Sequence, residues 1–389
     1  MRTRSTRIVP IPSITITLWL PNEVITEIFL HLPRADQLTL CRVSKLFHGL
    51  VLPILLQKVV LSPKWSNSST LKAFCTALIE NPARTDSVRS LTFINRAPYY
   101  AVAEDFLIQT LKLLRRLKHI WIEDRRIRGV VSHLSSLTFP DLSSCFFPRA
   151  DYNDTRKRDV AQFLGRHPTI TQLHLWDRPD TDIPQSILLP KLLYYNGSLH
   201  LLRCVSTDNL VVVQTTWTTQ SPIFVQILGA QTGHDFSLCI ECPLVEKVAQ
   251  VLVQLSTHMP RLQKLRLTGL NPRHQDYTVS LQFRCPYNFN SNPTTTMSET
   301  LNQITKCLPR FERLAYLALA LHHTARLPST AKVDEALRSW ADSCPTLRGG
   351  CIGKKAWMDV GDQWEACSRE EFDTEAGFVL WDRIFGSGE

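Results

Sequence analysis

Residues 20–53 read LPNEVITEIFLHLPRADQLTLCRVSKLFHGLVLP, and the pattern of apolar residues in this stretch predicts three short helices. In the first, Pro21, Val24, Ile25 and Ile28 have the i, i+3, i+4 and i+7 spacing of one helical face. Pro33 predicts the end of this helix, because the residue before a proline is pushed out of the α region. The stretch therefore begins with an amphipathic helix.

The second and third helical patterns follow directly along the chain. We expect Asp36 to be the N-cap of the second helix, since aspartate oxygens accept hydrogen bonds from first-turn amides. The third places Val43, Phe47 and Leu50 on one face, and Pro53 is expected to bend or end it. Three short helices cannot enclose all of these apolar side chains among themselves. We therefore expect some of them to face a partner; the alternative is that they cap the domain that follows.

The same stretch resembles the F-box family. The matching pattern is LP-x-E-x-x-x-x-I-x-x-x-L, then L-x-x-C-x-x-VSK-x-F, then LP. In that family the trihelical motif docks on the Skp adaptor of Skp–cullin–F-box ubiquitin ligases. Phe47 stands where many members have tryptophan, which implies weaker docking. The resemblance implies adaptor-facing or helix-setting roles for Leu20, Pro21, Ile28, Leu32, Val43, Phe47, Leu52 and Pro53.

Beyond residue 60, segments with the pattern L-x-x-L-x-L recur, and most follow an amphipathic helix. The chain passes from helix through proline to strand in HPTITQLHL (167–175), MPRLQKLRL (259–267) and CPTLRGGCI (344–352). Helix and strand repeated with the same faces apolar are typical of a leucine-rich-repeat solenoid. Because the spacing is irregular and the asparagine of the standard repeat is missing, another α/β sheet domain is the alternative.

These patterns predict the positions of several elements. We expect strands at 88–93, 117–122, 134–139, 170–175, 262–267 and 314–319, with a truncated copy at 199–201. Helices are expected at 101–116, 157–166, 244–258, 299–308 and 332–343, and a long loop at 285–299. The fold class is thus α/β overall, with a small all-α trihelical F-box followed by an irregular α/β leucine-rich-repeat-like solenoid.

The period-two geometry of a strand predicts which side chains lie on the concave face of such a solenoid. These are the residues that alternate with the core-facing leucines. Exposed aromatic side chains often anchor interfaces, so this set supplies the candidate substrate contacts. The candidates are His119, Trp121, His174, Trp176, His200, Lys264, Arg266 and Tyr316. The alternative for Trp121 and Trp176 is that they pack under loops.

Signatures of catalysis and of metal binding are weak. Cys239 and Cys242 form a C-x-x-C without a second ligand pair, and His322 and His323 are not part of an H-E-x-x-H motif. The segment GGCIGKK (349–355) lacks the spacing of a phosphate-binding loop. We therefore expect no enzyme activity of the chain's own, no cofactor and no metal.

Charge and cysteine content narrow the functional classes further. The net charge is +9, and residues 354–389 contain 4 basic and 9 acidic side chains, so residues 1–353 carry the basic excess. A basic body predicts acidic or phosphorylated protein targets, whereas nucleic acid is not expected because no clustered basic tract with aromatics occurs. An odd number of scattered cysteines, 11 in all, indicates reduced thiols in the cytosol or nucleus. The basic start of the chain resembles a mitochondrial presequence only faintly, because Pro10 and Pro12 interrupt it. No apolar run is long enough for a membrane span.

Together these observations predict four parts and one role. The parts are a flexible basic N-terminus (1–17), the F-box (18–60), a leucine-rich-repeat-like domain (61–353) and an acidic, aromatic C-terminal cap (354–389). For the last part, a partner-binding acidic peptide is the alternative. The resemblance, which extends to fungal proteins with divergent repeats, implies a substrate receptor of a Skp–cullin–F-box ligase. The competing interpretation is a scaffold that binds a partner without ubiquitination.

Overall fold

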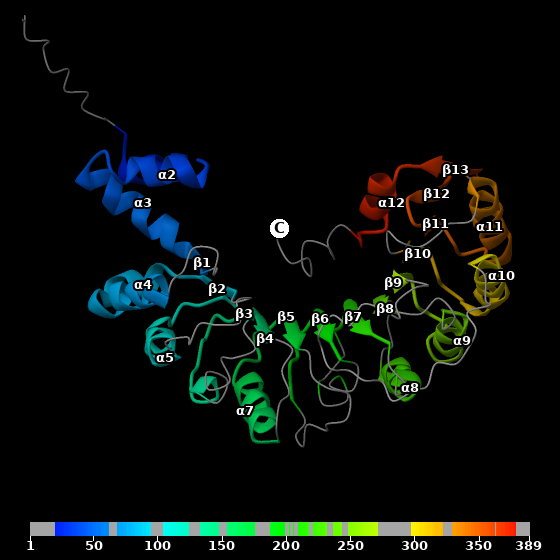
Figure 1. The fold of residues 1–389 in the computed structure, drawn as a ribbon, viewed down its shortest axis with the longest axis horizontal. Coiled ribbons are helices and arrows are strands. Elements are labelled where there is room, and N and C mark those ends of the chain that lie inside the picture. The colour runs from blue at the N-terminus through cyan, green and yellow to red at the C-terminus, as the bar shows by residue number, and fades with distance from the viewer. Residues whose placement is uncertain are drawn as a thin grey trace, which may run out of the picture. The chain divides into compact units, whose positions relative to one another are not determined.

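The structure is a computed structural model of the chain (Figure 1). It describes residues 20–61, 68–94, 104–123, 133–147, 154–175, 187–198, 202, 205, 209–217, 221–231, 236–242, 248–270, 297–321, 329–361 and 363–378. The chain divides into two compact units, Met1–Val59 and Val60–Glu389. Each unit is described separately below.

The first unit contains the three expected helices, α1 (Asn22–Leu30), α2 (Arg34–Leu40) and α3 (Lys45–Gln57). Ser44 begins α3, since its hydroxyl oxygen accepts a hydrogen bond from the Phe47 amide at 3.1 Å. The predicted N-cap at Asp36 is wrong: Pro33, with φ −54° and ψ 147°, precedes α2, and Asp36 lies in its first turn. A proline at this place has no N–H to leave unsatisfied.

Helix α3 also continues past Pro53, where we expected it to bend or end. The residues on both sides of the proline, Val51, Ile54 and Leu55, are buried in the core of the first unit. Their burial offsets the one backbone hydrogen bond that proline cannot donate. Ile25 and Phe29 of α1 complete this core, and the rings of Phe29 and Phe47 meet edge to face at 5.2 Å.

The second unit is built on one sheet of 13 strands that follow each other in chain order. From β2 to β11 the paired strands are parallel, and β11, β12 and β13 are joined antiparallel. The strands are β1 (Lys58–Leu61), β2 (Ser90–Ile94), β3 (His119–Glu123), β4 (Ser144–Phe147), β5 (Gln172–Leu175), β6 (Tyr194–Gly197), β7 (Val212–Thr216), β8 (Ser237–Glu241), β9 (Lys264–Leu270), β10 (Tyr316–Leu321), β11 (Gly349–Ile352), β12 (Lys355–Val360) and β13 (Gln363–Cys367).

Helices cover one face of this sheet, and we call the opposite face the inner face (Figure 1). The helices are α4 (Ser68–Glu80), α5 (Glu104–Leu113), α7 (Asp154–Gly165), α8 (Ser221–Gln231), α9 (Val248–His258), α10 (Met297–Cys307) and α11 (Thr330–Ser343), with 3-10 turns η1 (Pro82–Ser87) and η4 (Leu308–Arg310). A last helix, α12 (Arg369–Glu375), lies on the inner side. A parallel sheet in chain order with helices on one face is the solenoid architecture that the repeats predicted.

The passage from helix to strand uses a repeated local device. Five strands, β4, β5, β6, β9 and β11, begin four residues after a proline. Where threonine follows the proline, its hydroxyl donates to a carbonyl of the preceding repeat: Thr169 to Leu142 at 2.7 Å and Thr346 to Leu314 at 3.1 Å. These bonds fix the register between neighbouring repeats, because each satisfies a carbonyl that the strand ladder does not reach.

Most of the expected elements are confirmed, with two exceptions. Residues 134–139 do not form a strand; a helical turn and a loop occupy them, and the strand follows at β4. Pro140 sets its start, in the phrase FPDLSSCFF, which has the same form as the three phrases recognised in the sequence. The truncated copy at 199–201 follows β6 and lies outside the described residues. Most of the loop at 285–299 also lies outside them, and α10 begins at Met297.

His167 shows how tightly the repeats are joined. Its Nε2 accepts a hydrogen bond from the Phe139 amide at 2.8 Å, so the proton is on Nδ1, which donates to the Phe163 carbonyl at 2.6 Å. Burial lowers the pKa of His167, opposed by the bond to Phe163 and assisted by the charge of Arg166. The neutral ring therefore links the loop before β4 to α7.

Candidate functional site

The first unit leaves much apolar surface uncovered. Twelve large apolar side chains are exposed among the described residues, and seven of them lie between residues 20 and 46, with exposed fractions between 42% and 63%. We call these seven the exposed apolar set: Leu20, Val24, Ile28, Leu30, Leu38, Val43 and Leu46. The others are scattered along the sheet unit. Exposed apolar residues concentrated in so short a segment indicate a contact surface.

The residues that the resemblance assigned to the adaptor fall into two groups. Leu20, Pro21, Ile28, Val43 and Pro53 are exposed, whereas the remaining three are half-buried. Leu32 and Phe47 pack against the core of the first unit, which fits a helix-setting role, and Leu52 is also half-buried.

Sequence reasoning did not assign Val24, Leu30, Leu38 and Leu46 to this surface. The signal was present, because the buried residues of α1 are Ile25 and Phe29, and the helical period then turns Val24 and Ile28 outward. Leu30 and Leu38 were harder to place, since Leu30 is the last residue of α1 and Leu38 lies in a helix of only 7 residues, where the period is weakly defined.

One buried polar residue holds the first two helices together. Gln37 is 7% exposed, and its side-chain nitrogen donates to the carbonyls of Phe29 at 2.8 Å and Leu32 at 3.1 Å. The Phe29 carbonyl lies in the last turn of α1 and also accepts a hydrogen bond from the Leu32 amide at 3.3 Å, and Leu32 lies in the turn that follows. Gln37 thus fixes the geometry on which the exposed apolar set depends, and sequence reasoning missed it.

The inner face of the sheet brings the predicted substrate contacts into two neighbouring rows. His119, Lys264 and Tyr316 belong to one row, together with Gln172, Tyr194 and Gly349. Trp121, His174 and Arg266 belong to the next, which also contains Phe146, Asn196, Gln214, Cys239, Ala318 and Cys351. The period-two geometry therefore placed these residues on the correct face. Trp176 and His200 lie outside the described residues.

Three aromatic side chains form a stack over β3–β5. The rings of Trp121 and Phe146 are parallel at 4.0 Å, and His174 is tilted against both, at 5.3 and 5.5 Å. His174 is only 2% exposed, so its prediction as a surface contact is wrong. Its Nδ1 lies 3.4 Å from the Asn196 side-chain nitrogen, and burial lowers its pKa to about 4. The half-buried Trp121 and the exposed His119 also lie on this part of the face.

The C-terminal segment covers the other end of the inner face. After the hairpin β12–β13, the capping box of Ser368 and Glu371 begins α12. Phe372, Ala376 and Phe378 are fully buried and cluster with residues of the sheet, among them Tyr316. Tyr316 is 8% exposed as a result, so its prediction as an exposed contact is wrong as well.

The two predicted cations of this region contact the same segment. Lys264 Nζ donates to the Ala376 carbonyl at 2.7 Å and lies 5.5 Å from the Tyr316 ring centre. The Arg266 guanidinium lies 5.8 Å from the Phe378 ring centre. Burial lowers the pKa of Lys264, and the negative charge of Glu375 opposes this effect. The local period could not reveal this occupant, because Ala376 is 112 residues from Lys264.

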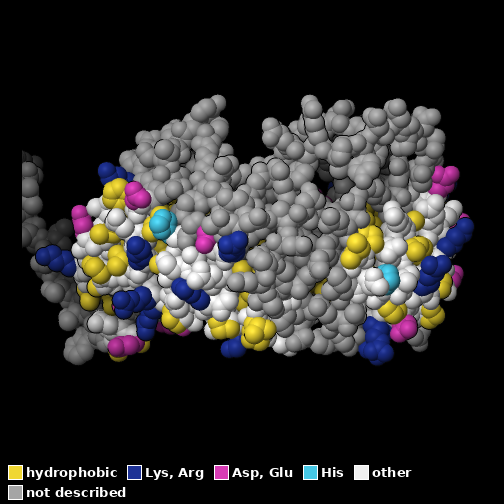
Figure 2. Space-filling view, turned by 90° about the horizontal axis from the view of Figure 1, so that it is seen from below, with side chains coloured by type: hydrophobic (Ala, Val, Ile, Leu, Met, Phe, Trp, Pro, Cys, Tyr) yellow, Lys and Arg dark blue, Asp and Glu magenta, His cyan; other side chains and the backbone are white. Residues whose placement is uncertain are grey.

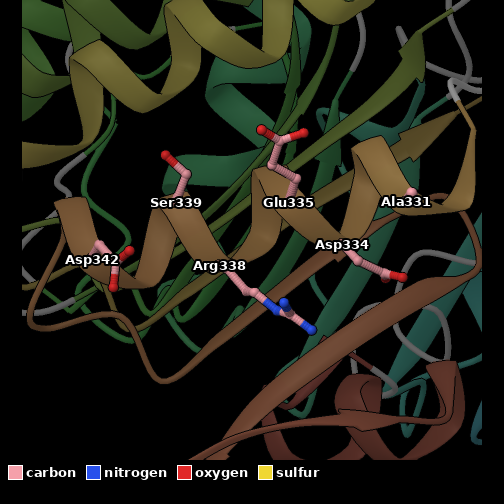
Figure 3. A pocket seen from close by; sticks show the side chains of 6 residues that line it. All are labelled: Ala331, Asp334, Glu335, Arg338, Ser339 and Asp342. Carbon is pink, nitrogen blue, oxygen red and sulfur yellow. The ribbon is translucent and has the colours of Figure 1, made fainter.

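The pocket on α11 does not bring reactive groups together. Its volume is about 510 Å³, and all of its lining residues come from one helix: Ala331, Asp334, Glu335, Arg338, Ser339 and Asp342. Figure 3 shows Asp334 and Arg338 pointing away from Glu335 and Ser339. Asp334 accepts a hydrogen bond from Trp357 at 3.1 Å, and Arg338 lies over the same ring. This polar surface therefore joins α11 to the hairpin.

The described residues contain neither a metal-binding cluster nor a membrane-spanning helix. No group of three or more His, Cys, Asp or Glu side chains is placed to hold a metal ion there. No helix in this part of the chain has the length and apolar character of a bilayer span. On the face in Figure 2, described Lys and Arg side chains are interspersed with apolar and acidic ones.

Comparison with known proteins identifies the first unit. Residues 18–53 match the model of the F-box domain family. No curated protein matches the chain. Two solved structures resemble it distantly. A chain from the crystal structure of the Rad7 and Elc1 complex in yeast has a TM-score of 0.35 and 12% identity, covering 79% of this chain and 91% of that one. A chain from the crystal structure of a TLR13–ssRNA13 complex has a TM-score of 0.27 and 12% identity, covering 69% and 42%.

The family match covers the region that contains the exposed apolar set. F-box proteins are typically non-catalytic subunits of ubiquitin ligases. Within the cullin complex they bind a Skp-type adaptor. A contact surface of exposed apolar side chains on three helices agrees with this role in general. Residues 18–53 of this chain are an F-box domain, followed by a repeat solenoid.

Proposed function

We propose that this protein is the substrate receptor of a Skp–cullin–F-box ubiquitin ligase, acting in the cytosol or nucleus. The exposed apolar set carries the proposal, because seven large apolar side chains exposed to water on one small helical unit need a partner to cover them. The F-box match of residues 18–53 supports a Skp adaptor as that partner.

The adaptor contact combines the exposed apolar set with residues that shape it. Ile28 and Val43, 48% and 63% exposed, would be anchors that lose water on docking. Phe47 fixes α3 against α1 through Phe29 and so sets the shape of the surface. Phenylalanine in place of the family's common tryptophan leaves less aromatic area for the adaptor.

The solenoid would hold the target on the part of its inner face over β3–β6. His119 is exposed and Trp121 is half-buried on β3, and Gln172 and Tyr194 lie in the same row as His119. The chain itself would transfer no ubiquitin. Holding the target near the catalytic subunits raises the effective concentration of its lysines, which is the whole contribution of a receptor.

Copurification tests this proposal. The full chain should retain a Skp-type adaptor, and the double change Leu20→Ala with Pro21→Ala should abolish retention while the circular-dichroism spectrum stays unchanged. Leu188→Ala, which changes an apolar residue of the solenoid that is 70% exposed, is the matched control. Retention by the double variant at the level of the control would refute the adaptor role.

A scaffold without ubiquitination is the competing function, and the target distinguishes the two. Affinity capture under mild proteasome inhibition should compare the intact chain with one lacking residues 1–60. A receptor predicts targets that bind through the solenoid in both cases and accumulate ubiquitin only when the F-box is present. Equal modification with and without the F-box would favour the scaffold.

A further inference from the structure

The segment Arg369–Phe378 lies where a ligand of the inner face would lie. A terminal cap has to cover the last strands of a solenoid, and the hairpin β12–β13 already pairs with β11. The segment instead reaches Lys264 and Arg266 on β9 and Tyr316 on β10. It therefore covers three residues that the sequence selected as target contacts.

The chemistry of the segment matches the surface beneath it. We call this surface the seat and define it as Lys264, Arg266, Tyr316, Gly349 and Cys351. The segment REEFDTEAGF carries four acidic side chains and one basic one, and the seat offers two cations. Charge complementarity of this kind favours an acidic peptide.

The contacts of the seat use groups that any peptide of this class has. Lys264 binds a backbone carbonyl and Arg266 lies over a phenylalanine ring. Burial and the negative charge of Glu375 raise the pKa of Tyr316. The carbonyl of Ala376 follows the last residue of α12, where the partial negative charge of a helix end attracts a cation. A foreign acidic segment with two phenylalanines would satisfy the same groups.

Gly349 shapes the seat for an aromatic ring. A Cβ at this position would lie 3.0 Å from Phe372 Cε2 and 3.0 Å from Tyr316 Cδ1. The neighbouring Gly350 faces the other way, toward Leu337 and Trp340 of the helix layer. A strand residue without a side chain thus leaves room for Phe372, whose ring centre lies 6.1 Å from that of Tyr316.

Helix α12 depends on the seat for its structure. It is 7 residues long, and helices shorter than about 12 residues are marginal in water by themselves. Its order therefore comes from docking, as in segments that fold on binding. Arg369 adds local support, donating to Asp373 at 2.6 Å and to the Cys351 sulfur at 2.7 Å.

We propose that the seat is a docking surface for an acidic, phenylalanine-bearing segment of the target, and that the chain's own Arg369–Phe378 occupies it until such a segment displaces it. This inference rests on the proposed receptor function. A tethered segment has a high effective concentration, so only a target that also contacts the inner face over β3–β6 competes well. The tail would thus raise the selectivity of the receptor.

A labelled peptide of residues 368–380, SREEFDTEAGFVL, tests the seat directly in the full chain. Fluorescence anisotropy should show binding to the variant Phe372→Ala with Phe378→Ala that is about 100-fold tighter or more than to wild type, as expected when a competitor that fills the seat about 99% of the time or more is removed. Glu370→Ala, an exposed change on the same helix, should bind as wild type does. Adding Lys264→Glu to the opened variant should abolish the gain.

Several outcomes would overturn the proposal. One is equal affinity of the labelled peptide for the folded opened variant and for wild type. Another is that a peptide with both phenylalanines replaced by alanine binds the opened variant as tightly as the original peptide does. Gly349→Ala provides a second opening that retains both rings, with an intermediate gain expected. Loss of folding in both variants would also overturn it, since the segment would then be an inseparable part of the core.

Adaptor copurification with the same variants separates this proposal from the proposed function. Retention of the adaptor without a gain in peptide binding refutes the seat alone. A gain in peptide binding without adaptor retention refutes the receptor role and supports the seat as a peptide-binding surface.

Discussion

The two ends of the described chain differ in how far their apolar side chains are exposed. In the F-box, Ile28 and Val43 are 48% and 63% exposed, whereas near the C-terminus Phe372 and Phe378 are completely buried on the inner face of the sheet. Apolar area removed from water is worth about 25 cal/mol per Å². The C-terminal segment gains this free energy within the chain, so the F-box must gain it from another molecule.

Burial of Phe372 gives the largest expected effect. Phe372→Ala should cost about 3–5 kcal/mol, the range for truncating a buried phenylalanine, and release the segment from the seat. Hydrogen exchange at residues 369–378 should become fast, because the amides of α12 lose their protection. Ile28→Ala in the F-box should change stability by less than about 0.5 kcal/mol, as exposed substitutions do. Comparable losses of stability in Phe372→Ala and Ile28→Ala would contradict the difference between the buried C-terminal segment and the exposed F-box surface.

Acid should weaken the solenoid through its buried histidines. His174 has a pKa lowered to about 4, so the unfolded chain binds a proton that the folded chain excludes between pH 6.5 and 4. The contribution of the neutral His174 ring to the free energy of unfolding is fully present above pH 6.5. It falls by about 3 kcal/mol as the pH decreases to 4. His167, whose pKa is also lowered, adds in the same direction.

Urea unfolding at several pH values measures this slope. His174→Gln should flatten it, and His48→Gln, which changes an exposed histidine of the F-box, should leave it as in wild type. An unchanged slope in His174→Gln would contradict the burial of a neutral ring.

Gln37 gives a smaller effect within the F-box. Gln37→Ala removes the side-chain hydrogen bonds to the carbonyls of Phe29 and Leu32, and such losses cost about 1–3 kcal/mol. Urea unfolding of the F-box helices should report this loss, and adaptor binding should weaken with it. Thr39→Ala, which changes an exposed residue of the same helix, is the control. Equal stability of the two variants would show that Gln37 does not hold α1 and α2 together.

Local patterns predicted much of the fold because its units are local. The proline four residues before a strand is visible in HPTITQLHL, MPRLQKLRL and CPTLRGGCI, and it gave β5, β9 and β11. Pro140 and Pro190 also stand four residues before a strand, but these strands were not predicted, because SSCFF and LYYNG contain few leucines. Strands β7 and β8 have no such proline at this offset, so only their place in the sheet reveals them.

The candidate sites were less predictable, and the reason is distance along the chain. Period two placed Lys264 and Tyr316 on the inner face correctly, but it carries no information on a segment about a hundred residues away that covers them. His174 was placed on the right face and wrongly expected to be exposed. In the F-box, exposure is set by neighbours within one turn of helix, and five of the eight residues selected there are exposed. Their contact with an adaptor stays a prediction.

The comparison between the F-box and the C-terminal segment depends most on whether the F-box surface binds an adaptor. Titration calorimetry of the full chain with a Skp-type adaptor should give an affinity that Ile28→Asp with Val43→Asp lowers about 100-fold or more, the loss expected when two interface anchors are replaced by charge. Leu188→Asp should bind as wild type does. Undiminished binding by the folded double variant would contradict the account.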